Sequence, residues 1–369
     1  MKKFFALFIG TIITLYAAQP KNSLISDNEL KKMIGRMLII GFEGESVNKN
    51  SKIVSLIQKY DIGGVILFDR YYNDKKKVKN ISSPKQLKAL TSSLKSFSNK
   101  PLLISVDQEG GKVARLKPAY GFQATPSAKV VSQMDEYMTK HVYNNLARTL
   151  SQAGINCDFA PVVDLAINPE NEVIVKLKRS YSDDTKEVVK YADIFIQSLK
   201  NKQIISVLKH FPGHGSSLGD SHKGFVDITK TWSKRELYPY IELIKRDKAP
   251  MIMSAHVFNS KLDDKYPATL SYKINTELLR KELGFNGVLV SDDMQMKAIS
   301  KHYELEKIVT LAINSGVDIL LFANQLSNQD TDELVETIFS QIKNGEITLQ
   351  RIVESNKRIE LLHKKYQTK

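Results

Sequence analysis

Short apolar runs rich in β-branched residues alternate along the chain with longer amphipathic segments. Each apolar run is bounded by turn residues and has the length of a buried strand. Several amphipathic segments end in glycine directly before the next run, as at Gly154, Gly284 and Gly316, and glycine at that position is the usual C-terminal cap of a helix. The pattern predicts eight strands, at residues 37–42, 63–68, 101–107, 155–165, 204–211, 250–257, 287–294 and 317–324.

This alternation predicts a parallel sheet, and the continuous apolar runs indicate strands that are covered on both faces. Eight strand–helix units in succession predict an α/β fold, a single-domain (β/α)8 TIM barrel that spans residues 27–369. The competing fold is an open doubly wound sheet, which normally has a glycine-rich turn after its first strand. The corresponding turn here, "GFEGES", lacks the dinucleotide-binding pattern and favours the barrel. The last segment, "LQRIVESNKRIELLHKKY", predicts a terminal amphipathic helix.

Residues 1–18 form an apolar segment that begins with two lysines. The apolar run is too short to span a membrane comfortably and is typical of a secretory signal peptide. Cleavage after Ala17 or Ala18 would place Leu15 or Tyr16 where a small residue is preferred, so the segment could instead persist as an N-terminal anchor. A buried N-terminal helix is a third interpretation. We expect an exported protein, in the periplasm or otherwise outside the inner membrane.

The composition of the 369 residues is that of a globular protein, with 42% hydrophobic and 25% charged residues. The formal net charge of +14 attracts polyanions. Nucleic acid is disfavoured as a partner because export is expected and because the lysines are not interleaved with aromatic residues. A basic surface suits peripheral association with an anionic wall polymer or a membrane. Cys157, the only cysteine, rules out an internal disulfide and is predicted to be an inert core thiol. We expect a monomer that needs no cofactor.

Polar residues accumulate where six successive predicted strands end. The chemistry of a (β/α)8 barrel lies on the loops at that end of the strands. Folding alone gives no reason for so many groups that are costly to bury to gather there, so we expect them to converge on one pocket. They are Asp107 and Glu109 after the third strand, Asp164 after the fourth, Lys209, His210 and His214 after the fifth, His256 after the sixth, Asp292 and Asp293 after the seventh, and Asn324 after the eighth.

Each of these residues also has a purely structural interpretation. Asp292 or Asp293 could cap the helix that starts near "MQMKAI". His256 could be a hydrogen-bonded core histidine, and Asp164 could simply end its strand. The Lys209–His210 pair could bind backbone carbonyls.

The segment "KHFPGHGSSLGDSH", residues 209–222, contains three of the seven histidines. Its proline and glycines prevent a helix. His214, Asp220 and His222 could form a metal site, since histidine and carboxylate in a tight loop are common zinc ligands. The His-x-x-x-His spacing, however, works best on a helix face, so we expect no metal.

Five motifs, "DQEGGKVARL", "DFAPVVDL", "KHFPGHG", "DSH" and "SDDMQM", follow one another along the predicted barrel. Together they resemble the exo-β-N-acetylglucosaminidases of glycoside hydrolase family 3, and the resemblance covers about residues 37–300. The catalytic domain of that family is a (β/α)8 barrel, in agreement with the strand pattern.

The resemblance implies a role for individual residues. Asp292 would be the catalytic nucleophile, His222 the general acid/base and Asp220 the partner of His222. His214 would help to hold the loop or the sugar. The substrate-binding residues would be Asp107, Arg115, Arg179, Lys209, His210 and His214.

These roles meet the needs of retaining glycoside hydrolysis. A carboxylate attacks the anomeric carbon, and a second group, typically within about 5 Å, protonates the leaving oxygen and then activates water. Histidine, with an unperturbed pKa of about 6.5, can be both acid and base near neutral pH. Asp220 could orient the imidazole and stabilise its protonated form. Because glycine-containing stretches flank this pair, we expect the loop to close over substrate.

The histidine also points to one branch of the family. Relatives that act on glucosides usually take a glutamate from a second domain, for which we expect no room here, so the loop would supply the proton. Lys112, Tyr181 and Ser182 depart from the family pattern and could alter the preference for sugar or leaving group.

The expected activity is release of terminal β-linked N-acetylglucosamine, from peptidoglycan if the protein is exported. The rival activities are those of a β-glucosidase or other β-hexosidase, of a phosphorylase, and of an enzyme with substrate-assisted catalysis by adjacent carboxylates. A non-catalytic envelope protein that binds peptidoglycan is the alternative from another class.

Overall fold

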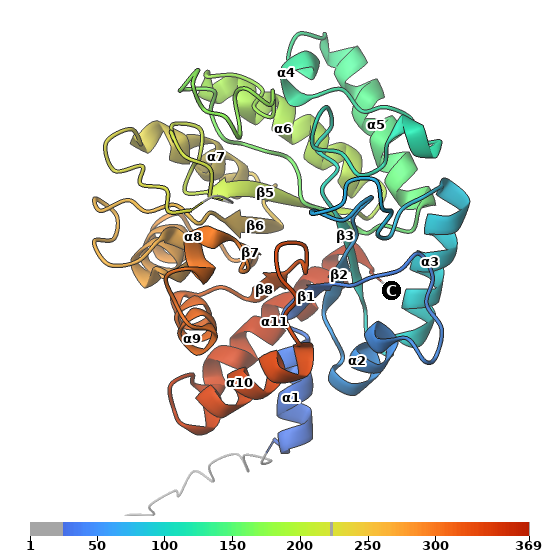
Figure 1. Cartoon of the computed structure of the whole chain (residues 1–369). Coiled ribbons are helices and arrows are strands. Elements are labelled where there is room, and N and C mark those ends of the chain that lie inside the picture. The colour runs from blue at the N-terminus through green and yellow to red at the C-terminus, as the bar shows by residue number, and fades with distance from the viewer. Residues whose placement is uncertain (1–24, 222–223, 369) are drawn as a thin grey trace, which may run out of the picture.

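Eight parallel strands close into a barrel in the order of the chain in a computed structural model that describes residues 25–221 and 224–368 (Figure 1). The predicted (β/α)8 barrel is therefore confirmed. The strands are β1 Leu38–Gly41, β2 Gly64–Ile66, β3 Leu103–Val106, β4 Cys157–Asp158, β5 Ile205–Phe211, β6 Met251–Ser254, β7 Val288–Asp293 and β8 Ile319–Phe322.

The barrel closes because β1 pairs on one side with β2 and on the other with β8. Ile39 lies in register with Gly64 of β2 and with Leu321 of β8. Each of the eight predicted strands contains one of these strands, but the fourth is much shorter than predicted. Pro161 has no N–H to donate, which limits the ladder to two residues and a separate bridge between Val162 and Lys209.

Helices surround the barrel and connect its strands (Figure 1). The predicted caps Gly154, Gly284 and Gly316 all have positive φ values, of 77°, 75° and 114°, which glycine adopts without strain. The helices are α1 Asp27–Gly35, α2 Lys52–Tyr60, α3 Pro84–Phe97, α4 Ala128–Val131, α5 Glu136–Gln152, α6 Thr185–Lys200, α7 Tyr238–Lys245, the π-helix η4 Lys273–Glu282, α8 Lys297–Ser300, α9 Leu305–Ser315, α10 Thr331–Lys343 and α11 Leu349–Tyr366, with short 3-10 turns η1 Pro118–Tyr120, η2 Lys234–Leu237 and η3 Ala268–Leu270.

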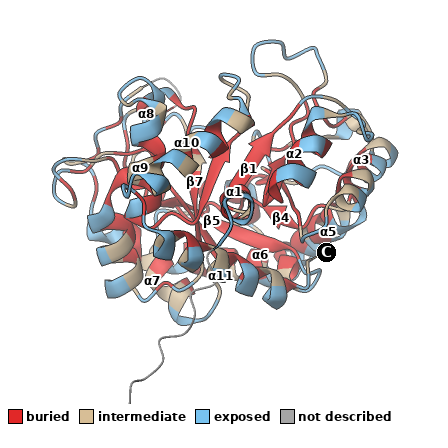
Figure 2. Cartoon of the chain, turned by 90° about the horizontal axis from the view of Figure 1, so that it is seen from below, coloured by how far each residue is buried: buried red, intermediate tan, exposed pale blue. Residues whose placement is uncertain are grey.

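The hydrophobic core is continuous from the barrel interior to the inner faces of the helices. Seen from below, the strands are buried and the outward faces of the helices are exposed (Figure 2). Cys157 is fully buried in β4, as expected for a core thiol, and burial raises the pKa of its thiol well above the usual value.

The predicted N-terminal signal or anchor, residues 1–18, lies outside the described residues. Within residues 25–221 and 224–368, no helix has both the length and the apolar character needed to cross a bilayer.

One buried carboxylate joins the last helix to the amino end of the barrel. Asp318, directly before β8, accepts hydrogen bonds from Arg351 (2.8 Å) and Arg358 (3.1 Å) of α11 and from Arg280 (2.6 Å) of η4. The main-chain N–H of Leu289 in β7 also donates to it (3.0 Å). Asp318 thus ties α11, η4 and two strands to a single point.

Replacing Asp318 with alanine should lower the free energy of unfolding by about 3–5 kcal/mol, because three guanidinium groups then lose their buried counterion. Urea denaturation followed by circular dichroism measures this. A matched control is Lys140→Gln, which breaks the exposed Glu136–Lys140 pair and should cost less than about 1 kcal/mol. Equal effects of the two changes would show that Asp318 does not anchor the fold.

Candidate active site

A cavity of about 660 Å³ opens at the carboxyl ends of the strands. It lies where the chemistry of a (β/α)8 barrel is found. Seven of the ten strand-end residues expected to converge line it, including Glu109 and Asp293, whereas Asp164, His256 and Asn324 do not. His222 lies outside the described residues. The predicted residues that line the cavity are Asp107, Arg115, Arg179, Lys209, His210, His214, Asp220 and Asp292.

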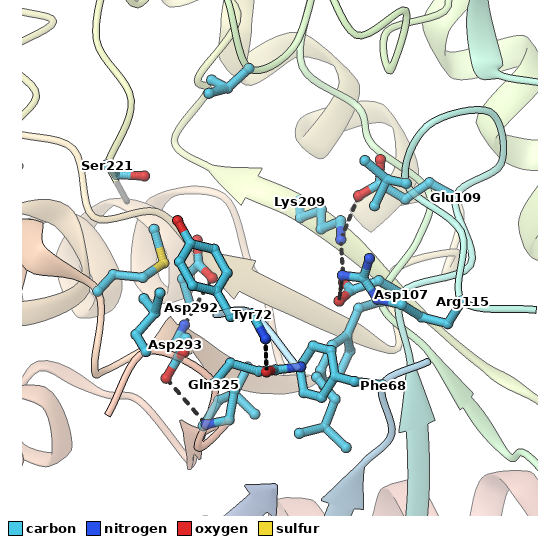
Figure 3. A pocket seen from close by; sticks show the side chains of 18 of the residues that line it. Phe68, Tyr72, Asp107, Glu109, Arg115, Lys209, Ser221, Asp292, Asp293 and Gln325 are labelled. Carbon is cyan, nitrogen blue, oxygen red and sulfur yellow. Dashed lines mark hydrogen bonds and ion pairs between the residues drawn. The ribbon is translucent and has the colours of Figure 1, made fainter. Parts of the chain in front are cut away.

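A cluster of five charged residues forms one side of the cavity, and Figure 3 labels four of them, Asp107, Glu109, Arg115 and Lys209. Lys209, whose side chain is 3% exposed, places its Nζ 3.0 Å from Oδ1 of Asp107 and 2.7 Å from Oε1 of Glu109. Arg115 donates to the other oxygen of Asp107 (2.9 Å). Arg179 donates through Nε and Nη2 to both oxygens of Glu109 (2.7 Å each). Side chains from β5, from the loop after β3 and from the segment between β4 and α6 are thereby held in one arrangement.

The cluster keeps its members ionised despite their burial. Burial alone would raise the pKa of Asp107, but the charges of Lys209 and Arg115 outweigh burial and lower it. Burial is likewise outweighed at Glu109, whose pKa is lowered by Arg179 and Lys209. Burial lowers the pKa of Lys209, yet its two carboxylate partners leave that pKa raised. The cavity therefore presents fixed charges at neutral pH.

The cluster also offers hydrogen bonds to a ligand. Nε of Arg115 is buried and has no hydrogen-bond partner within residues 25–221 and 224–368. A buried donor of this kind is normally satisfied, by water or by a ligand oxygen. Alternating carboxylates and cations suit a ligand with many hydroxyl groups, because each hydroxyl can both donate and accept.

Asp164 organises the loop that follows β5. Its carboxylate is fully buried and accepts the main-chain N–H groups of His210 (3.2 Å) and His214 (2.8 Å), and its Oδ2 lies 2.7 Å from Nδ1 of His210. Burial would raise the pKa of Asp164, but the His210 ring outweighs burial and lowers it. Asp164 therefore does more than end its strand, because its carboxylate holds the "KHFPGHG" segment in place through hydrogen bonds.

The two histidines of this segment have different surroundings. Nε2 of His210 lies 3.3 Å from Nη2 of Arg179, so His210 bridges Asp164 and the charged cluster. Nδ1 of His214 lies 2.7 Å from Oγ of Ser217. Burial, reinforced by the neighbouring His210, lowers the pKa of His214 to about 4. His214 is therefore neutral at pH 7 and both holds the loop and faces the cavity.

Glu236 of η2 supports the same loop from behind. Its side chain is 1% exposed, and its Oε2 accepts the main-chain N–H groups of Gly215 (3.0 Å) and Ser216 (3.4 Å). The packing requires glycine, since a Cβ on Gly215 would lie 1.8 Å from the carbonyl oxygen of Leu165. Burial, aided by the charge of Asp164, raises the pKa of Glu236 to about 7.

The two aspartates at the end of β7 have separate functions. Asp292 lines the cavity, and its Oδ1 accepts the main-chain N–H of Asp293 (2.8 Å). Oδ1 of Asp293 instead accepts the N–H groups of Gln295 and Ala323 (3.2 Å each), which ties β7 to the end of β8. The suggestion that one of them caps the following helix is wrong, since Met296 is the N-cap of α8 and makes no side-chain cap bond.

His256, at the end of β6, is a core histidine. It is buried, its Nδ1 lies 2.8 Å from Oγ1 of Thr269, and its Nε2 lies 3.0 Å from the carbonyl oxygen of Asp293. These contacts support the strand end that carries Asp292. Of the two interpretations of this residue, the structural one applies.

Asp220 lines the cavity on the far part of the loop after β5. The adjacent Ser221 accepts the main-chain N–H of Ala298 through its carbonyl oxygen (3.2 Å), which joins this part of the loop to α8 behind Asp292. Asp220 and Asp292 therefore face the same space. No three His, Cys, Asp or Glu side chains of the described part of the chain are grouped so that they could hold a metal ion.

Three contributors to this site are not evident from the sequence alone. The sequence predicts that Glu109 lies near the pocket, but it does not reveal that Glu109 pairs with Arg179 and Lys209. Glu236 gave no sequence signal, because only the fold brings it behind the loop. The loop after β2 supplies Tyr72 and Lys75 to the cavity, and its unusual composition, "DRYYNDKKKVKN", is a signal that could have been used.

The protein is a (β/α)8 barrel with a charged cavity at the carboxyl ends of its strands. The cavity can bind hydroxyl groups, so the protein belongs among the (β/α)8 proteins with a site for small polar ligands. The chain belongs to glycosyl hydrolase family 3: the family profile described as "Glycosyl hydrolase family 3 N terminal domain" matches residues 29–362. The resemblance drawn from the five motifs is thus confirmed.

Individual relatives agree with this assignment. "Beta-hexosaminidase A" of Pseudoalteromonas piscicida is 34% identical over 348 residues, which cover 84% of this chain and 56% of the relative. A "Beta-hexosaminidase" of Tolumonas auensis is 36% identical over 270 residues, covering 71% of this chain and 76% of the relative. A family 3 beta-N-acetylglucosaminidase structure from Paenibacillus superposes with a TM-score of 0.82 at 30% identity, covering 92% of this chain and 62% of that one. The chain therefore spans less than two thirds of the first and third of these proteins.

Replacing Glu236 with glutamine should change how stability depends on pH. Because the pKa of Glu236 is raised on folding, folded wild type keeps its proton between about pH 4.5 and 7, whereas the unfolded chain releases it. The free energy of unfolding of wild type therefore falls as the pH rises through that range. The variant keeps an oxygen acceptor but does not ionise. The urea midpoints of wild type and variant should nearly agree at pH 5. At pH 8 the free energy of unfolding of the variant should exceed that of wild type by up to about 3 kcal/mol. A difference that is independent of pH would contradict the raised pKa.

Proposed function

We propose that this protein is a retaining exo-β-N-acetylglucosaminidase that removes terminal β-linked N-acetylglucosamine. The observation that carries the proposal is the shared cavity in which Asp292 faces the charged cluster around Lys209. The names of the family 3 relatives support the sugar. In this reading the cluster binds the hydroxyl groups of the terminal sugar and Asp292 lies beside its anomeric carbon.

In the first step the Asp292 carboxylate attacks the anomeric carbon, and the bond to the leaving oxygen breaks. His222, protonated, gives its proton to that oxygen, so that the leaving group departs as an alcohol. The product on the protein is an α-linked glycosyl ester of Asp292. Asp220, two residues before His222 in the chain, stabilises the imidazolium and orients the ring.

In the second step His222, now neutral, takes a proton from water as the water attacks the anomeric carbon. The ester bond to Asp292 breaks and the sugar leaves with its original β configuration. His222 is again protonated and ready for the next cycle. Two displacements at one carbon thus retain the configuration, and the charged cluster holds the sugar in place through both.

The proposed natural substrate is peptidoglycan or a fragment of it. The N-terminal segment typical of export and the net charge of +14 support this, since wall polymers outside the inner membrane are anionic. We propose on the same grounds that the protein works in the periplasm or is otherwise exported. Cell fractionation with an antibody to the chain tests the location.

Release of p-nitrophenol from the β-N-acetylglucosaminide and from the β-glucoside tests the proposed activity. Wild type should prefer the N-acetylated substrate and be unaffected by EDTA. Asp292→Ala should lower kcat about 10⁴-fold or more, because the nucleophile is lost, and His222→Ala about 10²–10⁴-fold. Asp227→Asn is a matched control, because this exposed aspartate follows the loop without lining the cavity, and it should leave kcat unchanged.

Other outcomes would assign the protein elsewhere. Preference for the β-glucoside would indicate a β-glucosidase, and faster turnover with added phosphate would indicate a phosphorylase. Loss of activity to EDTA would mean that the loop holds a metal. Absence of turnover by folded wild type would favour a peptidoglycan-binding protein without catalytic activity.

A further inference from the structure

The loop after β3 forms a tight hairpin directly after Asp107. Gly110 and Val113 pair through two main-chain hydrogen bonds, of 3.1 and 3.3 Å. Gly110 has a φ of 102°, and a Cβ there would lie 2.1 Å from the carbonyl oxygen of Pro126, so this position requires glycine. The turn brings the chain back to the charged cluster, where Arg115 pairs with Asp107.

Gln108 joins the two arms of this hairpin. It lies between Asp107 and Glu109 in the chain, but it is 1% exposed and does not line the cavity. Its Oε1 accepts the main-chain N–H groups of Arg115 (2.8 Å) and Leu116 (2.9 Å), and its Nε2 donates to the carbonyl oxygen of Leu116 (3.3 Å). One buried amide thus holds the main chain of Arg115 close to Asp107.

Asp158 of β4 holds Gln108 from the neighbouring strand. Its carboxyl group is fully buried, and its Oδ1 accepts the main-chain N–H of Gln108 (2.9 Å). Asp158 does not line the cavity either. It therefore fixes, from behind, the residue that separates Asp107 from Glu109, and both of these carboxylates pair with Lys209.

The surroundings of Asp158 favour a neutral carboxyl group. Its Oδ2 is buried and has no hydrogen-bond partner in the described part of the chain, and the same holds for Oγ of Ser206, which lies in register with it on β5. A buried carboxylate oxygen without a donor is costly, whereas a protonated group is not charged. The titratable and charged groups around Asp158 are Cys157 on its own strand, Asp107 and Glu109 from the loop after β3, Lys209 of β5 and Tyr181 before α6.

We propose that Asp158 and Gln108 are positioning residues that hold Asp107 and Arg115 in the geometry that binds the terminal sugar. The inference rests on the proposed function, in which the charged cluster binds the hydroxyl groups of that sugar. Neither positioning residue lines the cavity, so both act through the main chain of the hairpin. A neutral Asp158 is part of this role, because a third carboxylate behind the cluster would repel Asp107 and Glu109.

Competitive inhibition by N-acetylglucosamine, measured with the p-nitrophenyl substrate, tests the role of Gln108. Gln108→Leu should raise the inhibition constant Ki and KM about tenfold and lower kcat much less, because sugar binding is disturbed and Asp292 is not. Asn156→Leu is the matched control. Asn156 is a second buried amide between β3 and β4, which accepts the N–H of Ile104 (2.7 Å) and donates to the carbonyl oxygen of Leu102 (2.9 Å) at the other end of these strands. It should lower the free energy of unfolding by a similar amount and leave Ki unchanged.

The pH dependence of Ki tests the role of Asp158. Burial, aided by the charges of Asp107 and Glu109, raises the pKa of Asp158 to about 8. If the sugar binds only while Asp158 is neutral, Ki of wild type should rise about tenfold between pH 7 and 9. Asp158→Asn keeps an oxygen that accepts the N–H of Gln108 but does not ionise, so its Ki should not change over this range.

The proposal is overturned if Gln108→Leu and Asn156→Leu change Ki equally, or if Ki of wild type and of Asp158→Asn depends on pH in the same way. In both cases wild type still cleaves the p-nitrophenyl substrate, so the proposed function stands. If Gln108→Leu does not fold, the comparison of wild type with Asp158→Asn decides. Failure of wild type to cleave the p-nitrophenyl substrate overturns the proposed function together with this inference.

Discussion

The arrangement of the whole site depends on one buried ammonium group. Lys209 extends from the end of β5 into an environment that solvent hardly reaches, and a buried charge must be paired there. Its two partners, Asp107 and Glu109, come from the loop after β3, and Glu109 in turn holds Arg179 from the segment before α6. The loop after β3 and the segment before α6 are therefore fixed to β5 by one set of mutually compensating charges. These ion pairs determine the shape and the polarity of the cavity.

In the loop after β5, the same titratable residues stabilise the loop and line the cavity. Asp164 and Glu236 accept its main-chain N–H groups from two sides, so a stretch broken by proline and glycine gains the hydrogen bonds that a helix would have provided. His210 and His214 complete this framework and face the cavity. Structure and chemistry are not separate in this loop, because the groups that fold it also line the site.

Much of this could be predicted from the sequence because the signals were local or periodic. Apolar runs and glycine caps identified every strand of the barrel, and polar residues at strand ends identified the cavity. The length of β4 was missed because Pro161 interrupts a ladder that its apolar neighbours would continue. The roles of Asp293, His256 and Glu236 depend on partners far away in the chain, which no local pattern reveals. The contribution of the loop after β2 was missed because its position at the cavity depends on a hydrogen bond to Gln325, which is distant in the sequence.

The most direct test of this account is to trap the covalent intermediate on Asp292. A 5-fluoro derivative of N-acetylglucosaminyl fluoride reacts with a retaining enzyme and leaves slowly, and mass spectrometry then locates the attached sugar. The account predicts one fluorosugar per chain, on the peptide that contains Asp292. A protein that turns over N-acetylglucosaminides while carrying no adduct, or one with the sugar on another residue, would contradict it.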